Sequence, residues 1–218
     1  ETFDVQYSDS GMTALINRLG FTYKKPTVIP GKADPEEQKS FLKKYKKLKK
    51  IKGKDDVIYF MDAVHPQHNT AAARAWIQRG QSFQIPTNTG RDRLNIHGAI
   101  NIETMDLVVS YEKTINAEST INFLKKIREQ SKNSGIIWLI CDNARYHHAK
   151  ILKSALKEMK IKLLFLPAYA PNLNVIERLW KFFKKKITSN QYYETFKEFK
   201  SACECFFDNI KDYEPQLR

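Results

Sequence analysis

Cysteine and long apolar runs are both scarce in this chain of 218 residues, and each scarcity excludes a class of protein. The three cysteines, Cys141, Cys203 and Cys205, form no CxxC pair, so neither a disulfide framework nor a structural zinc site is expected. This cysteine content fits a reducing compartment. No apolar run approaches the roughly 20 residues of a membrane span, and no signal peptide is recognisable. The sequence therefore predicts a protein with no membrane segment.

Several familiar catalytic motifs are missing too. The chain has no Walker loop, no GxGxxG turn and no serine-hydrolase elbow. Its histidines form no HExxH or zinc-type arrangement, and they are His65, His68, His97, His147 and His148. The sequence therefore does not indicate zinc-dependent, serine-hydrolase or nucleotide-loop chemistry.

Acidic residues are few beside basic ones. The chain has 24 Asp and Glu against 37 Lys and Arg, which gives a formal net charge of +13 and a pI near 9.5. A pI above about 9 favours a polyanionic partner. Charge alone does not separate DNA from RNA or an anionic membrane, and lysine-rich solvated faces would give the same balance. Hydrophobic residues make up 42%, enough for a packed core in one full domain plus a fragment of another.

Residues 1–35 are expected to be the C-terminal part of a helix-turn-helix or winged-helix unit. A short amphipathic helix is predicted over residues 10–20, where Gly20 stops it and residues 21–26 would begin a wing. Its apolar positions at helical spacing are Met12, Leu15, Ile16 and Leu19. The alternative is an ordinary short helix, because many such helices end in glycine.

Residues 36–55 are predicted to hold a basic linker helix that runs to about Lys52. Asp34 is placed to cap it, Pro35 to occupy its first position and Glu37 to complete a capping box. The apolar stripe consists of Phe41, Tyr45 and Leu48. The many lysines are explained by a solvated linker helix, and phosphate contacts are the alternative.

From residue 56 the pattern becomes α/β. The predicted strands are 57–63, 94–102, 107–115, 136–142 and 161–166, and the predicted helices are 117–132, 147–159, 173–187 and one near 193–210. Three successive strands followed by strand–helix alternation predict a mixed sheet flanked by helices. Residues 64–93 form an insertion of about 30 residues, far above the usual connection length, and are expected to have a function of their own.

Three carboxylates stand where a strand or turn ends: Asp62 after Val57–Met61, Asp142 after Ile136–Cys141, and Glu177 after Pro171–Ile176. An acid after an apolar run is costly to bury and tends to project into a cleft. Three carboxylates in one cleft would repel each other unless a cation lay among them. Oxygen ligands suit hard divalent ions, Mg²⁺ or Mn²⁺. In a basic protein this combination suggests metal-assisted chemistry on a nucleic-acid phosphodiester.

Each carboxylate also has a structural interpretation. Asp62 fits a hydrogen-bonded turn, and Asp142 fits a cap on the next helix. Glu177 fits a capping box in which Asn174 is the N-cap. The helix pattern argues against the capping-box interpretation of Glu177, because Glu177, Lys181 and Lys184 share a face beside the core stripe of this helix. The core stripe consists of Ile176, Leu179, Trp180, Phe183 and Ile187.

Three sequence blocks resemble the catalytic blocks of mariner-superfamily DDE transposases, with the bacterial insertion-sequence branch most similar. The blocks are Phe60-Met-Asp62, Asp142-Asn-Ala-Arg-Tyr-His147 and Leu166-Pro-Ala-Tyr-Ala-Pro-Asn-Leu-Asn-Val-Ile-Glu177-Arg-Leu-Trp180. Asp142 and Glu177 enclose 34 residues (177 − 142 − 1), the spacing typical of that branch. The resemblance covers about residues 56–210, and residues 1–35 are similar to the end of the family's second helix-turn-helix unit.

The resemblance implies a ribonuclease H-like catalytic domain over residues 56–218. Asp62, Asp142 and Glu177 would be its catalytic residues and would bind two Mg²⁺ or Mn²⁺ ions. The activity would be metal-dependent cleavage and strand transfer at the ends of a mobile element, cut-and-paste, into TA targets. Basic residues in or beside the blocks are expected to contact double-stranded DNA: Arg91, Arg93, Arg145, His147, Arg178, Lys181 and Lys184.

The family also places an insertion after its first strand that reaches a second subunit, so a homodimer through residues 64–93 is expected. A bacterial, cytoplasmic and nucleoid-associated protein is implied. Two alternatives stay open. One is another ribonuclease H-like nuclease or integrase. The other is a truncated or decayed transposase that binds DNA without cutting it, because the DNA-binding sequence expected upstream of Glu1 is missing.

Overall fold

The computed structural model describes residues 6–24 and 31–217, and its contacts divide the chain into two compact units, Glu1–Gly31 and Lys32–Arg218. Each unit is described by itself. The helices are α1 (Asp9–Arg18), α2 (Pro35–Ile51), α3 (Ala117–Gln130), α4 (Lys150–Glu158), α5 (Ile176–Ile187), α6 (Phe196–Asp208) and α7 (Glu214–Leu217), with 3₁₀ turns η1 (Arg145–His148), η2 (Pro171–Leu173) and η3 (Ile210–Tyr213).

The first unit contains α1, which ends where the sequence predicts. Gly20 has a φ of 84°, a conformation that glycine adopts without strain. Its N–H donates to the Asn17 carbonyl, and the Phe21 N–H donates to the Ile16 carbonyl, so a Schellman motif closes the helix. The expected wing over residues 21–26 extends into residues 25–30, which lie outside the described residues.

The second unit begins with α2, which packs against the sheet. Asp34 caps it by accepting hydrogen bonds from the Glu36 and Glu37 N–H groups, as expected from the sequence. Phe41 and Leu48 are buried in the core. The lysines of α2 are exposed.

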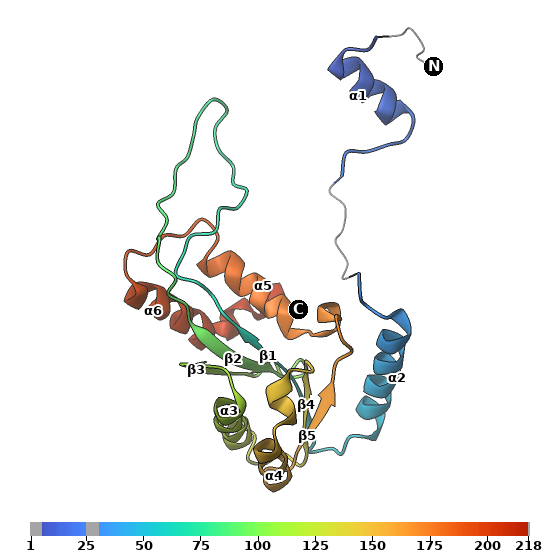
Figure 1. Cartoon of the computed structure of the whole chain (residues 1–218), viewed down its shortest axis with the longest axis vertical. Helices are drawn as coiled ribbons and strands as arrows, with labels where there is room; N and C mark the ends of the chain where they lie inside the picture. The colour runs from blue at the N-terminus through green and yellow to red at the C-terminus, as the bar shows by residue number, and fades with distance from the viewer. Residues whose placement is uncertain (1–5, 25–30, 218) are drawn as a thin grey trace. The chain divides into compact units, whose positions relative to one another are not determined.

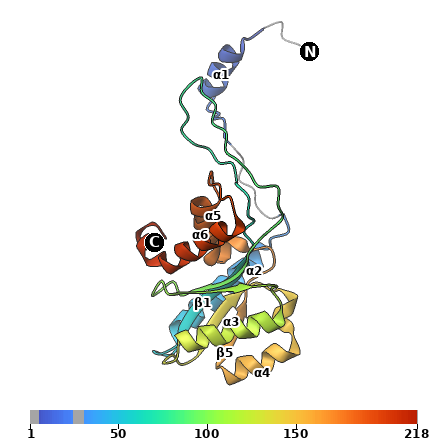
Figure 2. The ribbon, with the colours of Figure 1, turned by 90° about the vertical axis from the view of Figure 1, so that its left-hand side faces the viewer.

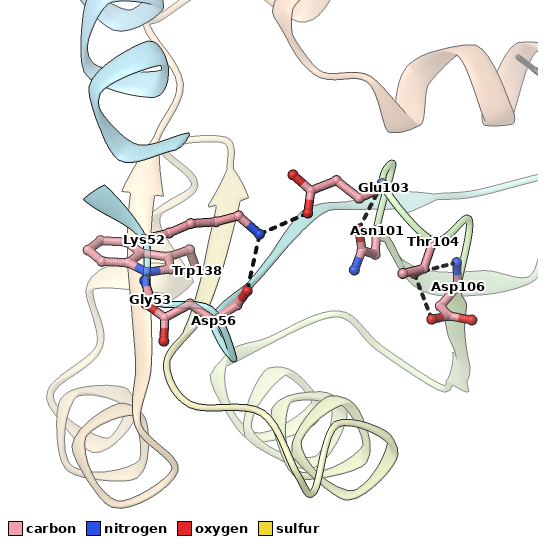
Figure 3. A network of polar contacts seen from close by, with 8 residues as sticks. All are labelled: Lys52, Gly53, Asp56, Asn101, Glu103, Thr104, Asp106 and Trp138. Atoms are coloured by element: carbon pink, nitrogen blue, oxygen red, sulfur yellow. Dashed lines mark hydrogen bonds and ion pairs between the residues drawn. The ribbon is translucent and has the colours of Figure 1, made fainter. Parts of the chain in front are cut away.

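A polar network fixes the end of α2 to the sheet (Figure 3). The Lys52 ammonium lies 2.8 Å from the Glu103 carboxylate, in the turn between two strands, and donates to the Asp56 carbonyl. The Asp56 carboxylate accepts from the Gly53 and Ile136 N–H groups at 2.9 and 2.8 Å. Because these groups come from separate segments, α2 is held at its C-terminal end as well as along its apolar stripe.

The sheet contains all five predicted strands: β1 (Val57–Val64), β2 (Asn95–Ile100), β3 (Leu107–Glu112), β4 (Ile137–Cys141) and β5 (Ile161–Phe165). Their order is β3-β2-β1-β4-β5, in which β2 is antiparallel to both β1 and β3, and β4 is parallel to both β1 and β5 (Figure 1). The carboxyl ends of the central strands β1 and β4 therefore lie at the same edge.

Helices cover both faces of this sheet (Figure 2). On β1, Ile58, Phe60 and Val64 contribute to the core under α5 and α6. Tyr59 and Met61 contribute to the core under α3 and α4. Successive side chains of a strand point to opposite faces, so Asp62, in phase with Phe60 and Val64, belongs to the α5 face.

The insertion over residues 64–93 forms a long loop between β1 and β2 (Figure 1). Its base is joined to the chain between α5 and α6. His68 is buried and contacts the Tyr193 carbonyl at 2.9 Å, and the Ala73 N–H donates to the Asn190 side chain. Trp76, in the outer part of the loop, is fully exposed.

Candidate active site

Asp62 and Asp142 are brought together by strand periodicity and topology. Asp62 lies near the carboxyl end of β1 on the α5 face, and Asp142 directly follows β4. Ile140, two residues before Asp142, packs in the same core as Phe60. Since β1 and β4 are parallel neighbours, the two acids lie at one sheet edge, where ligands of open α/β sheets collect.

Glu177 reaches the same place from the first turn of α5. The predicted capping box is wrong: the cap residue of α5 is Val175, which makes no side-chain cap bond, and the helix begins at Ile176 rather than near residue 173. Pro171–Leu173 forms a separate 3₁₀ turn. The Asn174 side chain is instead buried and donates to the Met61 carbonyl at 3.4 Å. The Glu177 carboxylate is therefore not used as a cap.

A cavity of about 490 Å³ joins the three acids. Its lining contains Asp62, Asp142 and Glu177 and no Lys, Arg or His. The other walls come mainly from the segment between β5 and α5, which includes Tyr169, in a left-handed conformation with a φ of 55°. The volume lies within the range of ordinary ligand sites, about 300–1,000 Å³.

Asp62 is the more buried aspartate. Its pKa is raised to about 7, mainly by burial and also by the negative charges of Glu177 and Asp142, against the Ala63 N–H and Trp180 hydrogen bonds that lower it. The Trp180 indole N–H donates to Asp62 Oδ2 at 3.1 Å. The indole reaches this position because Gly98, the register partner of Asp62 on β2, has no side chain. A Cβ at Gly98 would lie 2.3 Å from the Trp180 ring.

Asp142 has a different environment. Its side chain is 55% exposed, and His147 Nε2 lies 3.3 Å from its Oδ1. The His147 hydrogen bond lowers the pKa of Asp142. The Ala144 N–H also donates to Oδ1 at 3.4 Å, which is the local turn bond that the structural interpretation of Asp142 expected. Asp142 therefore stays ionised at neutral pH, whereas Asp62 is close to the midpoint of its titration.

The donor set fits a divalent cation. Three carboxylates share a cavity that has no basic residue, and the charges of two of them raise the pKa of the third. A cation among them would remove that repulsion. Among the described residues, no three His, Cys, Asp or Glu side chains are already close enough to hold one ion.

The sequence-predicted basic residues fall into three groups. Arg178, Lys181 and Lys184 are exposed on α5, and Arg145 is exposed beside the Asp142 loop. Arg91 and Arg93 are exposed at the end of the insertion. His147 differs from the expectation of a DNA contact, because its side chain is 2% exposed and faces Asp142.

Sequence reasoning did not identify Trp180, Gly98 and Asn174 as parts of the site. Trp180 was assigned only to the core stripe, and it is indeed buried. One signal was present in the sequence: a glycine inside a strand marks close approach by another group. No comparable signal exists for Asn174, whose local pattern favours a cap.

The chain combines a five-stranded mixed sheet, helices on both faces of that sheet, and a cavity lined by three carboxylates at the edge where two parallel strands end. The sequence model of the DDE superfamily endonucleases matches residues 57–200, and that of the winged helix-turn-helix matches residues 1–45. The chain belongs to the DDE superfamily of endonucleases.

One curated relative is a protein of an insertion element. The "Insertion element IS630 uncharacterized 39 kDa protein" of Shigella sonnei is 27% identical over 158 residues, which cover 72% of this chain and 46% of that protein. The chain thus spans about half the length of this curated relative.

Solved structures share the fold. The Mos1 transposase paired-end complex with left transposon end matches with a TM-score of 0.71 and 15% identity, covering 93% of this chain and 63% of that one. The mariner Mos1 paired-end complex with Mg matches with a TM-score of 0.71 and 16% identity, covering 95% of this chain and 65% of that one.

None of the helices in the described part of the chain has the length and apolar character needed to span a membrane.

Proposed function

We propose that this chain is the catalytic part of a DNA transposase, which cuts DNA at the ends of a mobile element and joins those ends to a TA target. The observation that carries the proposal is the shared cavity of Asp62, Asp142 and Glu177 in a chain of net charge +13. Membership of the DDE endonucleases and the likeness to an insertion-element protein support it.

Asp62, Asp142 and Glu177 would hold divalent ions, Mg²⁺ or Mn²⁺, and two solved neighbours are complexes with these metals. When bound, such ions supply Lewis acidity that activates a water and stabilises the leaving oxygen of an in-line displacement. Oxygen-only donors are the ligands that both ions prefer.

The protein's own groups orient these acids. Trp180 donates to one oxygen of Asp62 and so fixes the plane of that carboxylate. His147 Nε2–H donates to Asp142 Oδ1, and the buried imidazole is itself held between Tyr146 and Phe165, with ring centroids 4.4 and 6.5 Å away. We therefore assign His147 to the positioning of Asp142, in place of the DNA contact expected from the sequence.

The exposed basic residues would hold the DNA. Lys181 and Lys184 follow Glu177 on α5 at intervals of four and three residues, so they extend its face along the helix. A strand that presents its phosphate to the cavity would pass these ammonium groups. Arg145 and Arg178 flank the same cavity in sequence, and Arg91 and Arg93 lie where the insertion returns to the sheet.

The insertion is proposed to contact a second copy of the chain. Its base is fixed by His68, Ala71 and Ala73, which bond to residues 188–193. Its outer part exposes Trp76 and Phe83, at 105% and 66%. Large exposed aromatic side chains are enriched at interfaces between proteins.

A nicking assay tests the proposed function. The substrate is a duplex that carries the element's own ends, with Mg²⁺ or Mn²⁺ or with EDTA. We expect strand cleavage only with metal, and Asp142→Asn should reduce it by at least about a thousandfold, on the scale of other essential catalytic groups. DNA binding by this variant should persist. Full cleavage by Asp142→Asn would place the chemistry elsewhere, and binding without cleavage by the parent would favour a protein that only binds DNA.

A further inference from the structure

A second cavity, of about 340 Å³, lies at the same edge of the sheet as the carboxylate cavity and has the opposite charge. Its lining contains two permanent cations, Arg93 and Lys113, and no acidic residue. Both side chains are exposed, and neither forms an ion pair within the described residues. The cavity is therefore suited to an anion.

Hydrogen bonds fix the lining residues of this cavity. Asn95, at the start of β2, is one of its lining residues. The Asn95 amide donates to the Lys113 carbonyl at 2.7 Å, and its Oδ1 accepts from His65 Nδ1 at 2.8 Å. These two bonds join the start of the insertion to the end of β3. The Arg93 backbone lies between two further bonds, from the His68 N–H to the Asp92 carbonyl and from the Leu94 N–H to the Pro66 carbonyl.

Tyr146 and His147 connect the basic cavity to Asp142, with their ring centroids 4.4 Å apart. Tyr146 lines the basic cavity and directly precedes His147, which holds Asp142. Burial raises the pKa of Tyr146, and the nearby charges of Asp142 and Asp62 raise it further. Ala63, which also lines the basic cavity, directly follows Asp62 on β1, so the two side chains point to opposite faces of that strand. The two cavities therefore lie at the same edge of the sheet, on either side of the end of β1.

We propose that this second cavity binds a DNA backbone phosphate next to the one being cut, on the same strand, with Arg93 and Lys113 as its phosphate contacts. The inference rests on the proposed function, because it takes the carboxylate cavity as the place of cleavage. A strand whose scissile phosphate lies at the carboxylates must continue past one side of them. Cations on that side would fix the register of the strand without reading its sequence.

The test compares two charge-matched double variants of the whole chain. Arg93→Ala/Lys113→Ala removes the cavity's cations. Lys153→Ala/Lys157→Ala removes two exposed lysines from α4, neither of which lines the basic cavity or the carboxylate cavity. Binding of a labelled 20-base-pair duplex of arbitrary sequence is measured against salt, in EDTA. Each phosphate contact that is lost should flatten the slope of log affinity against log salt by about 0.9, so the slope should change by about 0.9 in the cavity variant and not at all in the α4 variant.

A second measurement places the contact on the strand. Duplexes carrying one uncharged methylphosphonate, at each position within three nucleotides of the cut, are bound by the parent and by the cavity variant. A methylphosphonate at a position beside the scissile phosphate should weaken binding by the parent. The same substitution should not weaken binding by the cavity variant, because that variant has already lost the contact. Arg93→Lys/Lys113→Arg, which keeps both charges, should behave as the parent.

The outcomes separate the two proposals. If the parent nicks element ends but the cavity and α4 variants have equal slopes, the cavity proposal is wrong and the proposed function stands. If the cavity variant keeps the parent's sensitivity to every methylphosphonate, the cavity proposal is likewise wrong. If the parent fails to nick, the proposed function fails, while the salt comparison still decides whether Arg93 and Lys113 bind phosphates.

Discussion

Asp62 and Asp142 follow neighbouring parallel strands and line one cavity, yet their surroundings are opposite. Asp62 is partly buried, accepts a hydrogen bond from an indole, and has its pKa raised to about 7. Asp142 is half exposed, is bonded by an imidazole, and has its pKa lowered. The comparison shows how carboxylates can share one cavity. A carboxyl group with a raised pKa lies beside one with a lowered pKa, and this arrangement carries less charge repulsion near pH 7 than fully ionised groups would.

The strongest way to disturb one side of this comparison is Gly98→Val. The new side chain would overlap the Trp180 ring, so the indole must leave its place over β2 and release Asp62. We expect a loss of stability of about 3 kcal/mol or more, the upper end for overpacking. In folded protein, cleavage should fall about a hundredfold because Asp62 is misplaced. Denaturant unfolding and the nicking assay measure the two effects.

Trp180→Phe is the matched control. It removes the indole N–H but adds no atoms, so Asp62 loses its donor without a clash at Gly98. Cleavage should fall while stability falls less than in Gly98→Val. The combination with Gly98→Ala should destabilise by less than the sum of the single changes, because the two positions are in contact. Additive effects on stability would mean that positions 98 and 180 are not energetically coupled.

The second comparison replaces each aspartate by asparagine and follows stability against pH in EDTA. The folded-state pKa of Asp62 is about 7, above an unfolded value of about 3.9, so the folded state binds the proton more tightly. Its ionisation therefore costs stability increasingly from about pH 4 and fully above about pH 7. Asp62→Asn removes this cost and should stabilise the protein by about 2–4 kcal/mol at pH 8, but not at pH 4.

Asp142→Asn should have the opposite sign. The pKa of Asp142 is lowered in the folded state, so its contribution is present above about pH 4 and is lost as pH falls through the folded pKa. Because the side chain is 55% exposed, the loss at neutral pH should be only about 1 kcal/mol. Urea melts of both variants at pH 4 and pH 8 measure this difference. Equal changes in the two variants would remove the contrast between the aspartates.

The smallest expected effect leaves both aspartates unchanged. Lys181→Ala/Lys184→Ala alters only exposed ammonium groups on α5. Affinity should fall equally for all DNA sequences, and the salt slope should flatten by about two ions. Sequence choice should not change, since lysines on phosphates carry no base information. An unaltered slope would mean that these lysines are simply a solvated face.

Much of the fold could be predicted because it depends on local pattern. Each of the five strands lies where its apolar run predicts, and the α5 stripe from Ile176 to Ile187 is buried as its spacing indicates. The boundaries of α5 and α6 were less accurate. The start of α6 was placed near 193 although Thr195 and Glu198 form a capping box that the sequence displays.

The site could be predicted only in part. The three acids were identifiable because a charge after an apolar run is unusual. Their supports were not, because Trp180 and Asp62 lie 118 positions apart and meet only through the packing of α5 on the sheet. His147 had no distinguishing signal either, since burial beside Asp142 depends on the 3₁₀ turn over residues 145–148. Contacts of this kind follow from tertiary structure rather than from periodicity.

Gly98 has a consequence for how related sequences can diverge. The space that it leaves on β2 is filled by the ring that serves Asp62. Any larger residue at position 98 requires a smaller one at position 180, and among the smaller aromatic residues phenylalanine has no N–H to offer. The two positions should therefore vary together in active relatives, and a change at one without the other should mark copies whose chemistry has been lost.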